Sequence, residues 1–250
     1  SSMLGLHIVK KLTKQNYKVI ALSRKKPKIK NKNVIFRKFD IKKKYSKKKF
    51  EKFFSDSNII IHAGCTTNYN KEKNKLFSFK MNLDKTREIG RLSYLNNKKL
   101  IFISGAIIYQ NQKIKNSENS KVKKNNKDLY IKSKINSEKI LTKFSRLGLR
   151  LIILRPSSIY GNGQNPNKII TKLVKKSSIK KKIYLYKSHR QVNLIHASDV
   201  ANFISLVIKT KKKVKGIFNV GGTLYTYKDI GKTLKELFNC QIIEDRSIKN

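Results

Sequence analysis

The chain has 250 residues, of which 38% are hydrophobic and only three are proline, so it can bury the core of a folded globular protein. Lys and Arg number 60 against 14 Asp and Glu, which gives a formal net charge of +46. This charge predicts non-specific attraction to polyanions, but it is spread from Lys10 to Lys249 rather than gathered on one segment. Composition therefore excludes a disordered chain without identifying a nucleic-acid-binding surface.

The sequence predicts neither a membrane span nor a disulfide framework. No apolar run reaches the roughly 18 residues that a membrane helix requires, and nothing near the start resembles a signal peptide. Cys65 and Cys240 lie far apart and form no CxxC or Cys/His cluster, so no zinc site is expected either. We expect a cytoplasmic protein. The chain opens in SSMLGLHIVKKL without an initiator Met, so we expect it to be truncated at the N-terminus and at the C-terminus.

Taken in chain order, the elements alternate between helical and strand patterns. Helical spacing of apolar residues occurs at Leu4, Ile8 and Leu12, over 76–95, from Ile131 to Phe144, and over 199–208. Short, nearly continuous apolar runs, which are typical of buried parallel strands, occur at 17–22, 33–40, 58–64, 99–105, 149–156 and 216–222. This alternation predicts an α/β protein with a Rossmann-type, doubly wound parallel sheet.

Two segments do not fit the alternation. The polar stretch 111–128 is interpreted as a surface loop, and the segment 162–192 as an insertion outside the sheet. We therefore expect a Rossmann domain over 1–160, whose first strand is missing, and a small substrate-binding lobe over most of 161–250. Residues 193–222 are expected to return to the Rossmann sheet.

The opening motif SSMLG is followed, at suitable spacings along nearly the whole chain, by seven more: RKFDI, IIIHAG, MNLDKT, FISGAIIY, YIKSKINSEK, LRPSSIYGNG and RQVNLIHASDVA. In this order they resemble the extended short-chain dehydrogenase/reductase family, the NAD-dependent epimerase/dehydratases that act on nucleotide sugars. Gly5 matches the third glycine of the family's GxxGxxG turn, and Ser2 stands at the second. The resemblance implies cofactor contacts from residues at strand ends and on three helices, namely Ser2, Leu4, Gly5, Ser23, Arg24, Asp40, Ile41, Ala63, Gly64, Asn82, Tyr130, Lys134 and Pro156.

Tyr130 and Lys134 are the expected catalytic pair, although a Tyr-x-x-x-Lys spacing means little by itself in a lysine-rich chain. Four residues are about one helical turn, so both side chains emerge on the same face of a helix. A phenol has an ordinary pKa of about 10 and needs a depression of roughly 3 units, or about 4 kcal/mol, to act as a base near neutrality. One ammonium at about 4 Å supplies a term of that order. The pair is therefore sufficient in principle.

Gly105 departs from the family pattern. It stands four residues before Tyr109, where the family generally carries the Ser or Thr that hydrogen-bonds the substrate oxygen. Ser104 is adjacent and is the third expected catalytic residue, but neighbouring side chains on a strand point to opposite faces. Ser104 would replace the missing hydroxyl only if the strand end turns there.

The end of the second expected strand, IALSRKK, bears on the cofactor. An acid there would select NAD, whereas an Arg accommodates a 2′-phosphate. Ser23 and Arg24 occupy this place, so we expect NADP in preference to NAD. His62 is expected to be a packed strand residue, and His196 and Asp199 are expected to orient a strand–helix junction.

The expected function is NAD(P)-dependent epimerisation, dehydration or reduction of a nucleotide sugar or a related hydroxy or keto compound. Ser157, Ser158 and Arg190 are the expected substrate contacts, and no metal is expected. A homodimer stays open as a further partner, whereas a membrane or a specific nucleic acid is not expected. Two alternatives remain: a non-catalytic dinucleotide-binding protein of the same fold, favoured by Gly105, and a basic nucleic-acid-binding protein, favoured by charge alone.

Overall fold

A computed structural model describes residues 2–66, 72–111, 115–124, 126–186, 188–210 and 214–245. Its main layer is a parallel four-stranded sheet in the order β3-β4-β5-β9, so the predicted Rossmann-type α/β fold is confirmed. The sheet is formed by β3 (Ile59–His62), β4 (Lys99–Ile103), β5 (Leu151–Pro156) and β9 (Gly216–Val220). None of the helices in the described ranges is both long and apolar enough to span a membrane.

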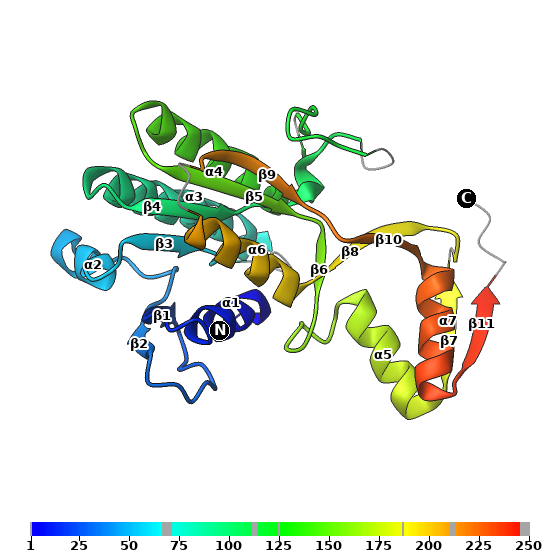
Figure 1. The fold of residues 1–250 in the computed structure, drawn as a ribbon. Coiled ribbons are helices and arrows are strands. Elements are labelled where there is room, and N and C mark those ends of the chain that lie inside the picture. The colour runs from blue at the N-terminus through cyan, green and yellow to red at the C-terminus, as the bar shows by residue number, and fades with distance from the viewer. Residues whose placement is uncertain are drawn as a thin grey trace.

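Helices cover both faces of this sheet (Figure 1). Ile101 and Ile103 of β4 pack with α1 and α6 on one face, whereas Leu100 and Phe102 pack with α2, α3 and α4 on the other. Because β4 and β5 are buried on both faces, they need continuous apolar runs rather than alternating ones. The helices of the two layers are α1 (Met3–Thr13) and α6 (Ala197–Lys209), then α2 (Lys47–Phe54), α3 (Glu72–Leu95) and α4 (Leu129–Arg146).

Two further strands, β1 (Val19–Ser23) and β2 (Val34–Lys38), form a separate parallel pair. The doubly wound order 3-2-1-4-5-6 places the strand that precedes the first helix between these two strands and the rest of the sheet. That position lies between β1 and β3, which do not pair with each other. In the described structure both β1 and β3 are therefore edge strands.

The remaining elements form a small lobe beside the carboxyl ends of the main strands (Figure 1). Its core is Leu173, Ile183, Leu185, Leu234 and Cys240. Of the segment 193–222, α6 and β9 belong to the main layers, whereas β8 pairs with β6 and β10. The lobe and its connections comprise β6 (Ser158–Tyr160), α5 (Ile169–Lys180), β7 (Lys182–Tyr186), β8 (Gln191–His196), β10 (Thr223–Thr226), α7 (Tyr227–Phe238) and β11 (Gln241–Asp245).

Gly222 lies where the chain leaves the main sheet and crosses β8 to begin β10. A Cβ at Gly222 would lie 1.8 Å from the backbone oxygen of Leu194, whereas a Cβ at Gly221 would come no closer than 3.8 Å, to the side chain of Asn193. Backbone cannot yield as a flexible side chain can, so Gly222→Ala should lower the free energy of unfolding by at least about 2 kcal/mol. Gly221→Ala is the matched control and should lie near wild type in urea unfolding. Equal stability of the two variants would contradict this account of the crossing.

Candidate functional site

Three buried hydroxyls mark the carboxyl edge of the main sheet. Thr66 follows β3, Ser104 follows β4 and Ser157 follows β5, and each side-chain oxygen is buried without a hydrogen-bond partner among the described residues. An unpaired buried hydroxyl costs roughly 1–3 kcal/mol. Since ligands of open α/β sheets bind outside the carboxyl ends of the strands, three such groups on adjacent strands indicate a surface that a polar ligand completes.

Tyr130 and Lys134 lie beside this edge on α4. Asp128 caps the helix by accepting hydrogen bonds from the N–H groups of Tyr130 (2.8 Å) and Ile131 (3.4 Å), which places Tyr130 in the first helical turn. Lys134 is only 5% exposed, and its ammonium donates to the carbonyl of Ile103 at 2.8 Å. An ammonium has three donors, and this bond uses one of them.

The ammonium of Lys134 also lies over two aromatic rings, 5.1 Å from the centroid of Phe102 and 5.8 Å from that of Tyr130. No carboxylate of the described residues forms an ion pair with it. The structure therefore brings Tyr130 and Lys134 together and leaves a positive charge beside the phenol.

Ser104 continues the strand geometry of β4. Its N–H donates to Leu154 at 2.8 Å, and Gly105 is extended, with φ 175° and ψ 145°. The alternation along the strand places Ser104 on the same face as Phe102, the face that α4 covers. The backbone is still extended at Gly105 and turns only in the 3-10 helix η1 (Ala106–Ile108) that follows. Ser104 and position 105 therefore face opposite sides, and Ser104 is no direct replacement for a side chain at 105.

A buried polar chain joins β3 to α3 and α4. The hydroxyl of Thr86 donates to the carbonyl of Asn82 (2.7 Å), so it accepts from His62 Nε2 (3.1 Å) and from the hydroxyl of Ser137 (3.3 Å). The Asn82 amide in turn bonds both the N–H and the C=O of Thr66, at 2.8 and 3.1 Å. Asn82 thus holds the loop that carries one of the three unpaired hydroxyls.

His62 is 5% exposed and lies against Phe102. Burial, with a further contribution from the positive charge of Lys134, lowers the pKa of His62 to about 3. The imidazole therefore stays neutral beside the ammonium, in agreement with the expectation that it is a packed strand residue. His196 likewise caps α6 by accepting from the N–H of Ser198 (3.3 Å), as expected for a residue at a strand–helix junction.

Other expected cofactor residues lie at the ends of α1, β1, β2 and β3. Ser2 caps α1 and accepts from the N–H of Gly5 at 3.2 Å, and a Cβ at Gly5 would lie 3.1 Å from that hydroxyl. A Cβ at Gly64 would lie 3.9 Å from the side chain of Ile41, so the segments that follow β2 and β3 contact each other there. Two further expected cofactor residues are apolar. Leu4 of α1 belongs to a buried hydrophobic cluster, and the partly buried Ala63 packs against the same cluster.

The polar groups at the ends of β1 and β2 have local partners. Ser23 donates its hydroxyl hydrogen to the carbonyl of Lys25 at 2.7 Å, while Arg24 is exposed. Asp40 accepts from the N–H of Lys42 at 3.0 Å. Arg24, the residue expected at a 2′-phosphate, is thus exposed directly after β1.

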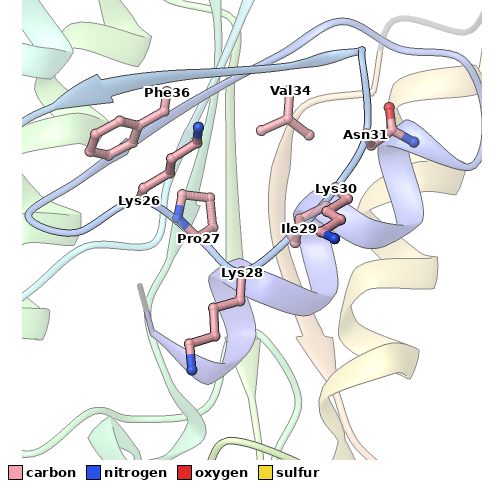
Figure 2. A pocket seen from close by; sticks show the side chains of 8 residues that line it. All are labelled: Lys26, Pro27, Lys28, Ile29, Lys30, Asn31, Val34 and Phe36. Atoms are coloured by element: carbon pink, nitrogen blue, oxygen red, sulfur yellow. The ribbon is translucent and has the colours of Figure 1, made fainter.

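A hollow of about 690 Å³ lies between the loop that follows β1 and one face of β2 (Figure 2). Its walls come from Pro27, Ile29, Val34 and Phe36, with lysines along its margin. It contains neither Tyr130 nor any of the three unpaired hydroxyls, so it is separate from the proposed centre of the chemistry.

The substrate residues expected from the sequence lie at the boundary between the sheet and the lobe. Ser158 begins β6 and is exposed, and the exposed Arg190 immediately precedes β8. Pro156, which was expected at the cofactor, ends β5 beside Val220. Glu138 and Arg155 were not expected from the sequence as site residues. They form a buried ion pair, in which Glu138 lies one helical turn after Lys134 on α4. A signal was present for Arg155, which is the single charge in the apolar strand LIILRP. Glu138 is marked only by its position one helical turn after Lys134.

Comparison with known proteins identifies one family. The model of the NAD dependent epimerase/dehydratase family matches residues 1–221. No curated protein sequence matches the chain. Among solved structures, the chain is similar to UDP-glucuronic acid 4-epimerase from Bacillus cereus in complex with NAD, with 18% identity, a TM-score of 0.84, and coverage of 98% of this chain and 87% of the other.

Two further solved structures have the same fold. One is dTDP-glucose 4,6-dehydratase from Bacillus anthracis in complex with NAD, with 19% identity, a TM-score of 0.81, and coverage of 98% and 82% of the two chains. The other is MoeE5 in complex with UDP-glucuronic acid and NAD, with 16% identity, a TM-score of 0.83 and the same coverage.

The buried, neutral state of His62 predicts a pH dependence of stability. The unfolded state takes up a proton near the ordinary pKa of about 6.5, whereas the folded state does so only near 3. Between these values the unfolded state binds more protons, so the free energy of unfolding should fall with decreasing pH by up to about 1.4 kcal/mol per unit. His62→Gln, which can still donate to Thr86, should lack this contribution in urea unfolding between about pH 6 and pH 4. If the free energy of unfolding changed with pH equally in the wild-type protein and in His62→Gln, this would contradict the assignment of His62 as a buried, neutral imidazole.

Proposed function

Because the chain belongs to the NAD dependent epimerase/dehydratase family, we propose that it is an NAD(P)-dependent enzyme that modifies a nucleotide sugar, with Tyr130 as its acid/base. One observation carries this proposal. The buried ammonium of Lys134 lies over the Tyr130 ring without a carboxylate partner in the described structure, next to a row of unpaired hydroxyls. Such an arrangement costs stability unless a ligand uses it.

The residues at the carboxyl edge fit a nicotinamide dinucleotide. The N-terminus of α1, with Ser2 and Gly5, presents backbone N–H groups suited to a pyrophosphate. Ser104 and Lys134 offer an unpaired hydroxyl and ammonium donors to polar groups of the cofactor. When bound, such a cofactor supplies the acceptor or donor of the hydride.

The chain itself supplies control of the proton. Tyr130 lies in the first turn of α4, where the helix dipole favours negative charge by roughly 0.3–1 kcal/mol. The ammonium of Lys134 acts in the same direction, and its bond to Ile103 fixes its position. Tyr130 is thus placed to take a proton from a substrate hydroxyl, or return one to a carbonyl, as the hydride moves.

The substrate class rests on the family and on the similar solved structures. The similar solved proteins carry UDP-glucuronic acid, or are named for dTDP-glucose and UDP-glucuronic acid. Ser157, Ser158 and Arg190 are proposed to contact the sugar nucleotide. Epimerisation, dehydration and reduction all use a nicotinamide cofactor and an acid/base pair of this kind. The proposal therefore covers these three reactions of nucleotide sugars without choosing among them.

We further propose that the cofactor is NADP rather than NAD. No acid stands at the end of β1, where the exposed Arg24 follows Ser23. The similar solved structures named above contain NAD, so the preference is a property proposed for this chain. A cytoplasmic location stays a prediction from the sequence.

Tyr130→Phe tests the proposed acid/base directly. The substitution removes only a hydroxyl, so turnover of a nucleotide sugar should fall by about 10²–10⁴-fold while cofactor affinity stays nearly intact. Lys134→Ala should lower both turnover and cofactor affinity, because it removes the charge beside the phenol and a donor proposed to contact the cofactor. The measurements are steady-state kinetics and a cofactor titration.

The matched control is Tyr94→Phe, an exposed tyrosine on α3 that packs near Phe144. It should turn over at the wild-type rate. Wild-type turnover in Tyr130→Phe would remove the catalytic role of this tyrosine.

Gly105→Ser tests the place where the chain departs from its family. A Cβ at 105 would meet only Ile107 at 3.7 Å and the backbone oxygen of Pro156 at 3.9 Å, which are ordinary contacts. The extended backbone also accepts any residue, so the variant should be as stable as wild type. Turnover should stay near wild type or rise by about tenfold, a modest part of the 10²–10³-fold that one well-placed donor provides.

A fall in turnover of Gly105→Ser with unchanged stability would mean that the bound substrate fills this space. Cofactor binding without turnover in either form would instead support the non-catalytic dinucleotide-binding alternative.

A further inference from the structure

The buried ion pair between Glu138 and Arg155 is the centre of a second polar network. The guanidinium of Arg155 on β5 donates to both carboxylate oxygens of Glu138 on α4, from Nε at 3.1 Å and from Nη2 at 2.7 Å. The two side chains are only 5% and 9% exposed. Bidentate pairs of this kind fix orientation as well as distance, so α4 is held against β5 one turn beyond Lys134.

Arg155 also reaches the segment that follows β4. Its Nη1 donates to the hydroxyl of Tyr109 (3.0 Å) and to the carbonyl of Glu118 (2.9 Å). Tyr109 passes its own hydrogen to the side-chain oxygen of Asn219 on β9, at 2.5 Å. One guanidinium thus links the catalytic helix, the segment after Gly105 and the edge strand β9.

Asn219 completes the connection to the loop. Its side-chain amide donates to the carbonyl of Asn116 at 2.9 Å, and its N–H donates to the carboxylate of Glu118 at 2.8 Å. This N–H holds the pKa of Glu118 below its ordinary value, so the carboxylate stays charged. Residues 116–118 are therefore fastened at the carboxyl edge of β9, on the side of the sheet edge where the substrate is proposed to lie.

The ion pair with Arg155 also prevents Glu138 from pairing with Lys134. Glu138 stands four residues after Lys134, a spacing at which a helical Glu and Lys can pair. Arg155 takes both oxygens of that carboxylate, and Lys134 keeps its charge directed at Tyr130. Ser137, at the neighbouring position, bonds Thr86 of α3, so α4 is anchored on two sides at this level.

We propose that Arg155, held by Glu138, is a positioning residue that couples the Tyr130–Lys134 helix to the loop 116–118 and keeps Glu138 away from Lys134. This inference rests on the proposed function for its effect on turnover, but the coupling itself is a property of the fold. A misplacement of about 1 Å can cost on the order of 10²-fold in rate, so loss of the coupling should lower kcat without weakening cofactor binding.

Two variants break the network at different points. Tyr109→Phe removes the hydroxyl between Arg155 and Asn219 but keeps the ion pair, and it should lower kcat by about tenfold with the KM for cofactor unchanged. Glu138→Ala leaves Arg155 unpaired and should lower kcat by about 10²-fold. A cavity of about 370 Å³ borders Glu138 and Arg155, so formate can enter the Glu138→Ala protein and should restore part of the lost rate, whereas chloride at equal ionic strength should not.

The matched control is Asp56→Asn, which removes the carboxylate from the Arg37–Asp56 ion pair at the other end of the fold. It should leave kcat unchanged and be insensitive to formate. Hydrogen–deuterium exchange supplies a readout that needs no activity: exchange at residues 116–119 should rise in both network variants and not in Asp56→Asn, and formate should lower it in Glu138→Ala.

The outcomes separate the two proposals. Absence of turnover in the wild-type protein, together with raised exchange at 116–119 in the variants, would remove the proposed function and support the coupling. Unchanged exchange at 116–119 together with unchanged kcat in Tyr109→Phe would overturn the coupling. This test with Tyr109→Phe stands even if Glu138→Ala does not fold. A loss of rate in Glu138→Ala that formate leaves untouched, with wild-type behaviour of Tyr109→Phe, would overturn it as well.

Discussion

The rest of the site depends on the burial of one cation. Lys134 is almost fully removed from solvent, and a buried charge is costly unless neighbouring groups compensate for it. Compensation comes from the carbonyl of Ile103 and from the faces of Phe102 and Tyr130. A carboxylate partner would satisfy the ammonium more completely, but it would also cancel the charge that the proposed acid/base role of Tyr130 requires. The surroundings satisfy both demands because His62 is neutral and Glu138 is bound to Arg155.

The same constraint explains why two polar networks meet at α4. The chain His62–Thr86–Ser137 reaches the helix from α3, and Arg155 reaches it from β5. Packing of apolar side chains tolerates small shifts, whereas fully satisfied buried hydrogen bonds specify one arrangement. The networks also extend outward, one through Asn82 to Thr66 and the other to the loop around Glu118. The proposed catalytic pair and the surfaces proposed for cofactor and substrate are therefore tied to a common frame.

Much of this fold could be predicted because its signals are local. Apolar runs identified the strands of the main sheet, and the four-residue spacing identified the shared face of Tyr130 and Lys134. The ordered motifs then indicated the family, which the match over residues 1–221 confirms. The pairing of β8 with β6 and β10 outside the main sheet depends on long-range contacts that no local pattern contains.

The partners of individual polar groups were equally out of reach. The sequence places Asn82 near the cofactor by resemblance, but only the structure shows that its amide is bonded to the backbone of Thr66. Glu138 could equally pair with Lys134 or with a more distant cation, and tertiary geometry decides for Arg155. Likewise, only the extended backbone of Gly105 shows that Ser104 and position 105 face opposite sides.

The central claim is that the carboxyl edge of the sheet binds a nicotinamide dinucleotide beside Tyr130 and Lys134. The most direct test is a fluorescence titration of the protein with NADPH and with NADH at about 0.5 M salt, where the non-specific attraction of a +46 chain for anions is screened. The account predicts saturable binding of one cofactor per chain, tighter for NADPH, with the preference reversed in Arg24→Asp. Absence of saturable binding of either cofactor would contradict it.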